Sequence, residues 1–322
     1  MALHFKRAVF DPDAVRKRWT EQKGEKLSPE QLQARKYEER DDIVLAVNAA
    51  LVTRRPLLVY GPPGSGKSSL AAFVAEVLGW RYYEYVITSR TQAQDLMWSF
   101  DAIRRLSDAQ ARSKASLHAP PAYIEPGVLW WAFDPKSARK RGARTKENST
   151  MPATDIARWG KAENSVILLD ELDKADPFVP NDLLVPLDRG WFDVSDLNFR
   201  VTCPAGRQVL LIITTNGERE LAPAFLRRCV QLRLKAPGQE QLQRIAELHH
   251  GPDKDGLHAQ VAKSLLMLQQ IAISKRAREP STAEFLDAIR ACRQLDIRPE
   301  ESDAWKQLSA SILEKHSTFA DG

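Results

Sequence analysis

The nine residues 61–69, GPPGSGKSS, restrict the fold of this chain more than any other segment. They fit the pattern G-x-x-x-x-G-K-[ST], with an apolar run before them and a helix-forming segment after them. The glycines let successive backbone N–H groups point at phosphate oxygens, and the N-terminus of the following helix adds a partial positive charge. A glycine-rich turn can meet the pattern by chance, but the flanking strand and helix argue against that alternative. The segment therefore predicts a phosphate-binding loop.

The same pattern assigns chemistry to individual side chains. Lys67 is expected to reach the β- and γ-phosphates of a nucleotide, and the Ser68 hydroxyl is expected to bind Mg²⁺. We therefore expect ATP and Mg²⁺ as the cofactors. The loop residues expected to hold the nucleotide are Gly61, Pro62, Pro63, Gly64, Ser65, Gly66, Lys67, Ser68 and Ser69.

A pair of acidic residues, Asp170 and Glu171, ends a second apolar run, which begins SVILLD at 165–170. Phosphoryl transfer depends on positioning and charge stabilisation, so Asp170 is suited to hold the nucleotide's hydrated Mg²⁺ together with Ser68. Glu171 is suited to orient or deprotonate an attacking water. An aspartate at a strand end is alternatively a helix cap, an interpretation that the phosphate loop makes less favourable. Glu171 favours hydrolysis over a small-molecule kinase, which needs an acceptor pocket.

Apolar strands alternate with helical segments through the middle of the chain. Such continuously apolar strands are typical of a parallel sheet that is covered on both faces. We therefore expect an α/β fold in which a P-loop parallel sheet is sandwiched by helices. The strands are expected at 56–61, 82–88, 165–170 and 209–216, and the helices at 41–55, 67–79 and around 177–189.

The strands stop after Pro237, and four helical segments follow. We expect a core domain at 37–236 and a smaller C-terminal α-helical domain at 237–322. Residues 1–36 are polar and weakly periodic, and we expect an N-terminal extension with some helix.

Two stretches interrupt the alternation, and we expect an insertion hairpin near each of 95–164 and 190–209. The first contains adjacent tryptophans, Trp130 and Trp131, which either pack in the interior or grip a substrate. It also contains a basic run at 136–146. That run is either a solvated loop or a patch that faces an acidic protein or nucleic acid.

A third strand, 209–216, ends in Asn216, whose amide is expected beside the attacking water or the γ-phosphate. Together with the phosphate loop and the acidic pair, this residue resembles sensor 1 of the AAA+ ATPases. Within that superfamily, residues 170–194 and 94–133 are similar to the MoxR type. The first segment resembles the MoxR helix and β-hairpin that precede sensor 1, and the second resembles an insertion in the second core helix. The resemblance covers residues 37–295.

The resemblance implies a lid domain at 237–322 and a homo-oligomeric ring, expected to be a hexamer. It also implies that an arginine beyond sensor 1 enters the neighbouring subunit's nucleotide site. Arg228, directly before the next strand, is the better candidate for this arginine finger, and Arg227 is the second. Two solvated arginines at a helix end are the structural alternative. MoxR-type proteins are implied to be chaperone-like and to act on a protein partner, often with a von Willebrand A-type protein.

The chain departs from the family at one position. The resemblance places Ala283 where a lid helix usually carries the sensor 2 arginine. Arg278 or Arg276, just upstream, is a candidate replacement, and either is alternatively a surface charge. The departure leaves open how strongly the bound nucleotide controls the lid.

The bulk composition excludes several classes of protein. The net charge of +5 is too small to establish nucleic-acid binding, and three separated cysteines do not make a disulfide framework. We recognise no signal peptide and no apolar stretch long enough to span a membrane, so we expect a cytoplasmic protein. The main expectation is an ATPase that remodels a protein. The alternatives are a motor or loader that acts on nucleic acid, and a nucleotide-gated scaffold with little turnover.

Overall fold

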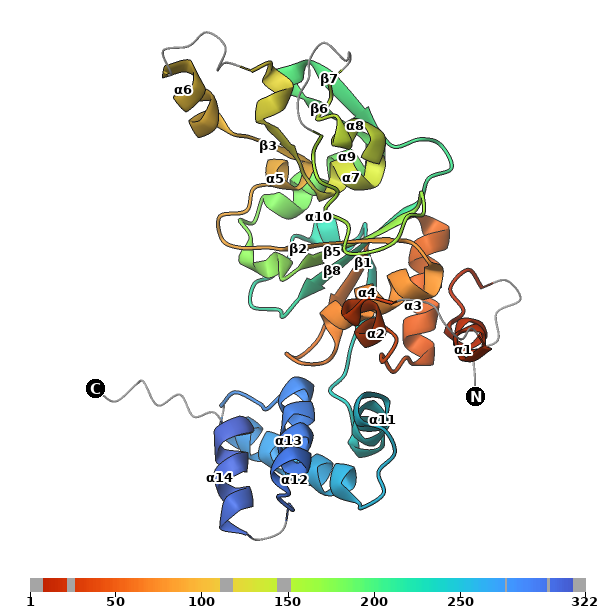
Figure 1. Ribbon diagram of the computed structural model, residues 1–322, viewed down its shortest axis with the longest axis vertical. Coiled ribbons are helices and arrows are strands. Elements are labelled where there is room, and N and C mark those ends of the chain that lie inside the picture. Colours follow the sequence, from red (N-terminus) through yellow and green to blue (C-terminus); the bar gives the residue numbers. More distant parts are fainter. Residues whose placement is uncertain are drawn as a thin grey trace.

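A five-stranded parallel sheet lies at the centre of the core domain (Figure 1). The structure is a computed structural model that describes residues 8–21, 27–110, 118–143, 152–275, 277–299 and 302–314. The strand order is β2–β5–β8–β1–β9, and every neighbouring pair is parallel. The strands are β1 (Leu57–Tyr60), β2 (Arg81–Val86), β5 (Ser165–Asp170), β8 (Val209–Thr215) and β9 (Val230–Arg233).

Helices cover both faces of this sheet, which explains why its strands are continuously apolar. Because successive strand residues point to opposite faces, Leu168 packs with helices α3 (Asp41–Thr53) and α4 (Lys67–Leu78). Leu169 packs on the other face with α7 (Val128–Phe133) and α9 (Val179–Arg189). The predicted α/β fold is therefore confirmed.

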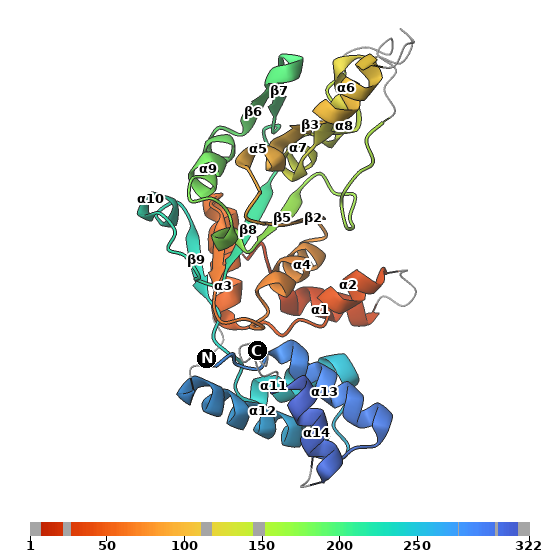
Figure 2. The same ribbon diagram turned by 90° about the vertical axis from the view of Figure 1, so that its left-hand side faces the viewer.

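The two insertions form small antiparallel sheets at the end of the core that is remote from the C-terminal helices (Figures 1 and 2). In the second insertion, β6 pairs with β7 around a 3₁₀ turn, η4, which gives the predicted hairpin. In the first, β3 pairs with β4, and α6 lies between them in the chain. The elements of the two insertions are α5 (Ala93–Met97), β3 (Trp98–Phe100), α6 (Ala102–Gln110), η2 (Pro120–Tyr123), β4 (Ile124–Pro126), α8 (Pro135–Arg139), β6 (Trp191–Val194), η4 (Ser195–Leu197) and β7 (Phe199–Thr202).

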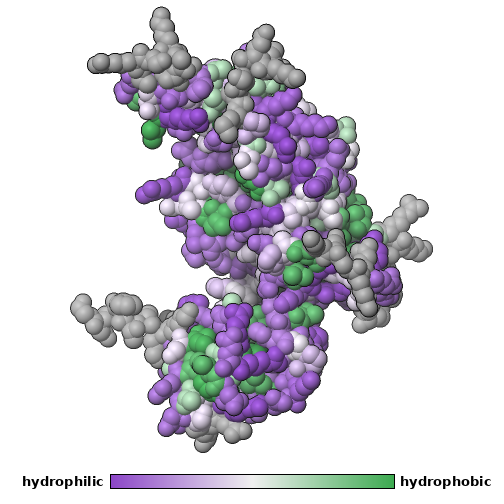
Figure 3. All heavy atoms as spheres, viewed as in Figure 1, coloured by the Kyte–Doolittle hydropathy of each residue, from purple (hydrophilic) through white to green (hydrophobic). Residues whose placement is uncertain are grey.

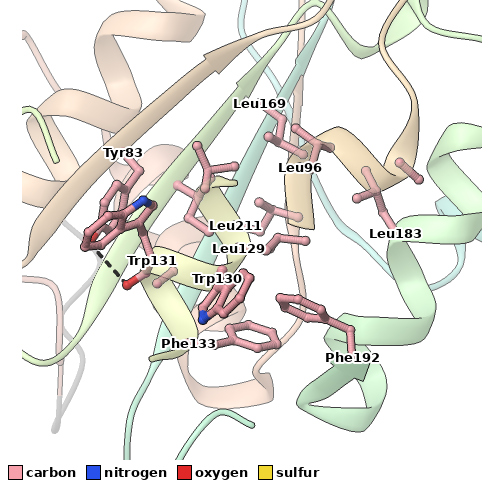
Figure 4. Packing of buried hydrophobic residues seen from close by; sticks show 14 of the residues in the cluster. Tyr83, Leu96, Leu129, Trp130, Trp131, Phe133, Leu169, Leu183, Phe192 and Leu211 are labelled. Atoms are coloured by element: carbon pink, nitrogen blue, oxygen red, sulfur yellow. Dashed lines mark hydrogen bonds between the residues drawn. The ribbon is translucent and has the colours of Figure 1, made fainter. Parts of the chain in front are cut away.

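Trp130 and Trp131 lie in helix α7, and both are buried (Figure 4). The Trp130 ring stacks on Phe199 with the centroids 5.9 Å apart, so the two insertions share one aromatic cluster. The Trp131 carbonyl accepts a hydrogen bond from the Tyr83 hydroxyl of the central sheet at 3.2 Å. Interior packing is therefore confirmed, and a substrate-gripping role for this pair is wrong.

The basic run at 136–146 is only partly described by the structure. Lys136, Arg139 and Lys140 are exposed on and just after α8. Arg141 turns inward, where it donates to the Ile124 carbonyl at 2.7 Å. Residues 144–146 lie outside the described residues. The described part of the run therefore contains three exposed basic side chains and one arginine that is bound to β4 of the same insertion.

The segment before residue 37 packs on the core through helices α1 (Pro12–Glu21) and α2 (Pro29–Ala34). Phe10 is fully buried, and its backbone is held by Asn48 of α3. Asn48 Oδ1 accepts from the N–H groups of Val9 and Phe10 at 2.9 and 3.0 Å. Asn48 Nδ2 donates to the Phe10 carbonyl at 2.8 Å and to the Val44 carbonyl at 2.9 Å. One buried amide therefore makes three hydrogen bonds that join residues 9 and 10 to α3.

Four helices form a separate C-terminal domain below the sheet (Figures 1 and 2). They are α11 (Gln239–His250), α12 (Leu257–Ser274), α13 (Thr282–Leu295) and α14 (Asp303–Ile312). Their apolar faces meet in a core of their own that includes Leu242, Leu265 and Phe285. The predicted C-terminal helical region is therefore confirmed, and we refer to it as the lid.

The face of the molecule in Figure 3 is largely hydrophilic, with smaller hydrophobic areas on both the core and the lid. Within the described part of the chain, no helix combines the length and apolar character needed to cross a membrane.

We predict that Asn48→Ala lowers the free energy of unfolding by about 1–3 kcal/mol, because it leaves the buried N–H and carbonyl groups of Phe10 without partners. Urea denaturation followed by tryptophan fluorescence measures this change. The exposed Gln94→Ala is the control and should lie within about 0.5 kcal/mol of the wild type. Equal stability of the two variants would show that Asn48 does not hold the segment.

Candidate active site

The phosphate loop connects the end of β1 to the start of α4, as the sequence pattern predicts. Two of its glycines are required by close contacts. A Cβ on Gly61 would lie 2.3 Å from the Leu234 carbonyl oxygen, and a Cβ on Gly64 would lie 2.4 Å from Ser281 Cβ. Gly64 also has a φ of +72°, in the left-handed region that favours glycine. The loop is therefore enclosed by the residue after β9 on one side and the lid on the other.

Lys67 lies at the first position of α4 and is largely buried. Its Nζ donates to the carbonyls of Gly61 and Pro62 at 2.8 and 3.0 Å, so the ammonium stays over the loop. Burial lowers the pKa of Lys67, and the negative charges of Asp170, Asp173 and Glu171 act in the opposite direction. A partly desolvated ammonium in this position is suited to bind an anionic phosphate.

Asp170, the last residue of β5, lies against the start of α4. The Ser68 hydroxyl donates to its two carboxylate oxygens at 2.8 and 2.9 Å. The Thr214 hydroxyl of β8 also donates to Asp170 Oδ1. The structure therefore brings together the two oxygen ligands that the sequence nominates for a metal.

Glu171, directly after β5, has φ +62° and ψ +49°. For a residue with a side chain, this left-handed conformation costs about 1–2 kcal/mol. Its backbone N–H donates to the Thr214 hydroxyl oxygen at 2.9 Å, and Asn216 Nδ2 lies 3.4 Å from Glu171 Oε1. Glu171 Oε2 is 2.6 Å from Lys174 Nζ. The candidate base and the candidate sensor residue are thus neighbours.

Three residues near the acidic pair were not predicted from the sequence: Asp173, Lys174 and Thr214. Asp173 is buried, and its Oδ2 accepts from the N–H groups of Asn216 and Glu218 at 3.1 and 3.0 Å. This carboxylate therefore fixes the loop that carries Asn216. The only signal for it in the sequence is its position two residues after Glu171 in DELDKAD.

A cavity of about 400 Å³ joins these groups to the lid and to the segment before α3. Tyr37 forms part of the wall and stacks on Phe73 with the centroids 5.2 Å apart; burial raises its pKa. The cavity therefore extends between residues 37–43, the phosphate loop and the lid. The residues that line it include Tyr37, Ile43, Pro63, Gly64, Ser65, Gly66, Lys67, Ser68, Ser69, Asp170, Glu171, Thr214, Asn216, Pro237, His249, Thr282, Ala283 and Leu286.

Arg227 and Arg228 lie elsewhere, after the short helix α10 (Pro223–Leu226) and before β9. Since Val230 pairs with Leu57 at the beginning of β1, both arginines are at the amino edge of the sheet, whereas the phosphate loop is at the carboxyl edge. Helix α10 is remote from the seam between core and lid in both ribbon views (Figures 1 and 2). Arg228 is half exposed, and its Nε is 3.7 Å from Asp188 Oδ2.

Ala283, in the first turn of α13, lines the cavity. Arg278 lies on the far side of the phosphate loop, where its Nη1 is 3.0 Å from Glu284 Oε1. Arg276 lies outside the described residues. The structure therefore does not bring Arg278 into the nucleotide cavity.

A phosphate loop, an acidic pair and a polar amide at the carboxyl edge of one parallel sheet, closed by a helical lid, define a P-loop ATPase. The family model described as AAA domain (dynein-related subfamily) matches residues 56–229, more than half of the chain. The chain belongs to this family of AAA ATPases. A comparison with curated proteins gives no match. Membership implies nucleotide binding and, in general, ATPase activity.

We predict that Asp173→Ala lowers kcat for ATP by about 10–100-fold, because groups that orient the reacting residues commonly have effects of this size. KM for ATP should change less than about threefold, since Asp173 accepts hydrogen bonds from Asn216 and Glu218 and makes none with the phosphate loop. Steady-state phosphate release measures both constants. The exposed Asp176→Ala in the same loop is the control. An unchanged kcat in Asp173→Ala contradicts the role given to the buried carboxylate.

Proposed function

We propose that the protein is an Mg²⁺-dependent ATP hydrolase that works as a homo-oligomeric ring, with a hexamer as the expected assembly. The observation that carries this proposal is the meeting of Ser68, Asp170, Glu171 and Asn216 at one end of a single cavity. Glu171 next to the metal-binding pair favours water as the acceptor of the phosphoryl group.

The residues present fit a magnesium ion. Ser68 and Asp170 offer only oxygen ligands, and Mg²⁺ is usually held by one or two such side chains with waters and substrate phosphates completing its shell. When bound, such an ion would supply positive charge that offsets the negative charge of the phosphates.

The chain's own residues divide the hydrolytic step between them. The loop N–H groups and Lys67 hold the phosphates and offset their charge. Glu171 accepts a proton from the attacking water, and the Asn216 amide orients that water beside Glu171 Oε1. Thr214 and Asp173 hold the backbone from which these two side chains project.

A second copy of the chain is proposed to complete each site with Arg228, and Arg227 is the second candidate. The support is positional: Arg228 and the phosphate loop of one chain are separated by the length of β1, four residues or about 13 Å. An arginine on that edge is too far from its own nucleotide but is free to project toward another copy. Its exposed position beside Asp188 leaves the guanidinium accessible.

The proposed substrate is a protein that the ring remodels, in the chaperone-like manner of the MoxR type and with a von Willebrand A-type protein as a possible partner class. The support is the resemblance of residues 94–133 and 170–194 and the joined insertions at one end of the core. A motor or loader on nucleic acid is the alternative. The exposed Lys136, Arg139 and Lys140 favour that alternative.

We predict that Arg228→Ala and Lys67→Ala are each nearly inactive, since an arginine finger accounts for roughly 10³–10⁵ in rate. When the two variants are mixed in equal amounts, about one site in four should combine an intact pocket with an intact neighbouring arginine. ATP hydrolysis should then reappear and is measured by phosphate release. If mixed assemblies form but hydrolysis does not return, the shared site is disproved.

We predict that tagged Glu171→Gln, which should bind ATP without hydrolysing it, captures a protein in ATP and releases it in ADP. Mass spectrometry of the captured material identifies the substrate class, and Lys67→Ala is the control because it should not bind ATP. Recovery of nucleic acid without protein, together with ATPase stimulation by DNA that falls steeply with salt, would instead favour the motor or loader.

A further inference from the structure

Both carboxylate oxygens of Glu171 have defined neighbours, and the two contacts differ in strength. Oε2 lies 2.6 Å from Lys174 Nζ, which is a short, charge-assisted hydrogen bond. Oε1 lies 3.4 Å from Asn216 Nδ2, which is at the long end of the hydrogen-bond range. One oxygen is therefore held firmly, and the other is held loosely beside the proposed sensor amide.

The backbone after β5 explains why Lys174 reaches Glu171. The left-handed conformation of Glu171 turns the chain directly into a short 3₁₀ helix, η3 (Leu172–Lys174). The Lys174 N–H donates to the Glu171 carbonyl at 3.0 Å. In a 3₁₀ turn, residues three apart lie on the same side, so the Lys174 side chain returns over the Glu171 carboxylate. The strained backbone of Glu171 thus belongs to the same turn that brings Lys174 to the Glu171 carboxylate.

We propose that Lys174 is a positioning residue for hydrolysis: it fixes Glu171 Oε2 so that Oε1, beside Asn216, is the oxygen that receives the proton from water. This inference rests on the proposed function, because it assigns Glu171 as the base. It adds a residue that neither the phosphate loop nor the acidic pair includes.

The surroundings of Lys174 favour a functional role over a structural one. The Lys174 and Glu171 side chains are 43% and 31% exposed, and ion pairs between such groups contribute little to folding stability. Hydrogen bonding to Glu171 raises the pKa of Lys174, and the charges of Glu171, Glu218 and Asp173 add to that effect. The lysine therefore remains a charged donor at the base, while its removal should leave the fold intact.

The test compares Lys174→Ala and Lys174→Arg with Lys306→Ala, which removes another lysine from an i,i+3 pair with an aspartate, in α14 of the lid. We expect Lys174→Ala to lower kcat about tenfold or more, because a poorly placed general base loses part of its usual 10²–10⁴-fold effect. KM and the affinity for a fluorescent ATP analogue should change less than about twofold. Lys174→Arg should restore most of the rate, and Lys306→Ala should match the wild type.

Two further measurements separate positioning from a general loss of structure. In a Glu171→Gln background, Lys174→Ala should cause no additional loss of rate, because its effect passes through Glu171. A crystal structure of nucleotide-free Lys174→Ala should show the Glu171 side chain displaced from the position beside Asn216. Thermal unfolding of Lys174→Ala and the wild type should coincide.

The outcomes distinguish this inference from the proposed function. If the wild type hydrolyses ATP and Glu171→Gln does not, but Lys174→Ala is fully active or leaves Glu171 in place, the positioning role is overturned and the hydrolase stands. If the wild type binds ATP and hydrolyses none under any assembly condition, both are overturned.

Discussion

The contact between Ser68 and Asp170 is the interaction on which the candidate site depends. It joins the first turn of α4 to the end of β5, and the two residues are 102 positions apart in the sequence. The Thr214 hydroxyl adds β8, the strand that lies between the phosphate-loop strand and the acidic strand. The buried parallel sheet fixes the positions of these oxygen-bearing side chains. The end of the cavity that they line is therefore preorganised.

The position of that contact follows from the topology of the sheet. The carboxyl ends of β1, β8 and β5 are adjacent in the sheet. The residues that follow these strands therefore lie close together: the phosphate loop after β1, Asn216 after β8 and the acidic pair at the end of β5. The same topology sends Arg228 to the other edge, since it precedes β9. The phosphate loop and the proposed arginine finger therefore lie at opposite edges of one sheet, and the proposed ring is a geometry that uses both edges.

The sheet, its covering helices and many of the residues that line the candidate site were predictable because each has a local signal. Glycine spacing marked residues 61–69, and polar residues after apolar runs marked Asp170 and Asn216. Lys174 and Asp173 were missed because their roles depend on the left-handed turn at Glu171, which gives no periodic pattern. The burial of Trp130 against Phe199 depends on contacts between two insertions, and sequence alone left its role open. The same limit applies to Asn48, whose partners lie 38 and 39 residues away.

The close approach of Gly64 to Ser281 has a mechanical consequence. Ser281 is the N-cap of α13, a 14-residue helix that spans about 21 Å. With no room for even one carbon atom between loop and cap, a small rotation at this junction is magnified along the helix: about 5° at one end becomes about 2 Å at the other. Steric contact through the glycine is therefore a means by which a movement of the loop can displace the lid, and this means needs no charged side chain in the first turn of α13.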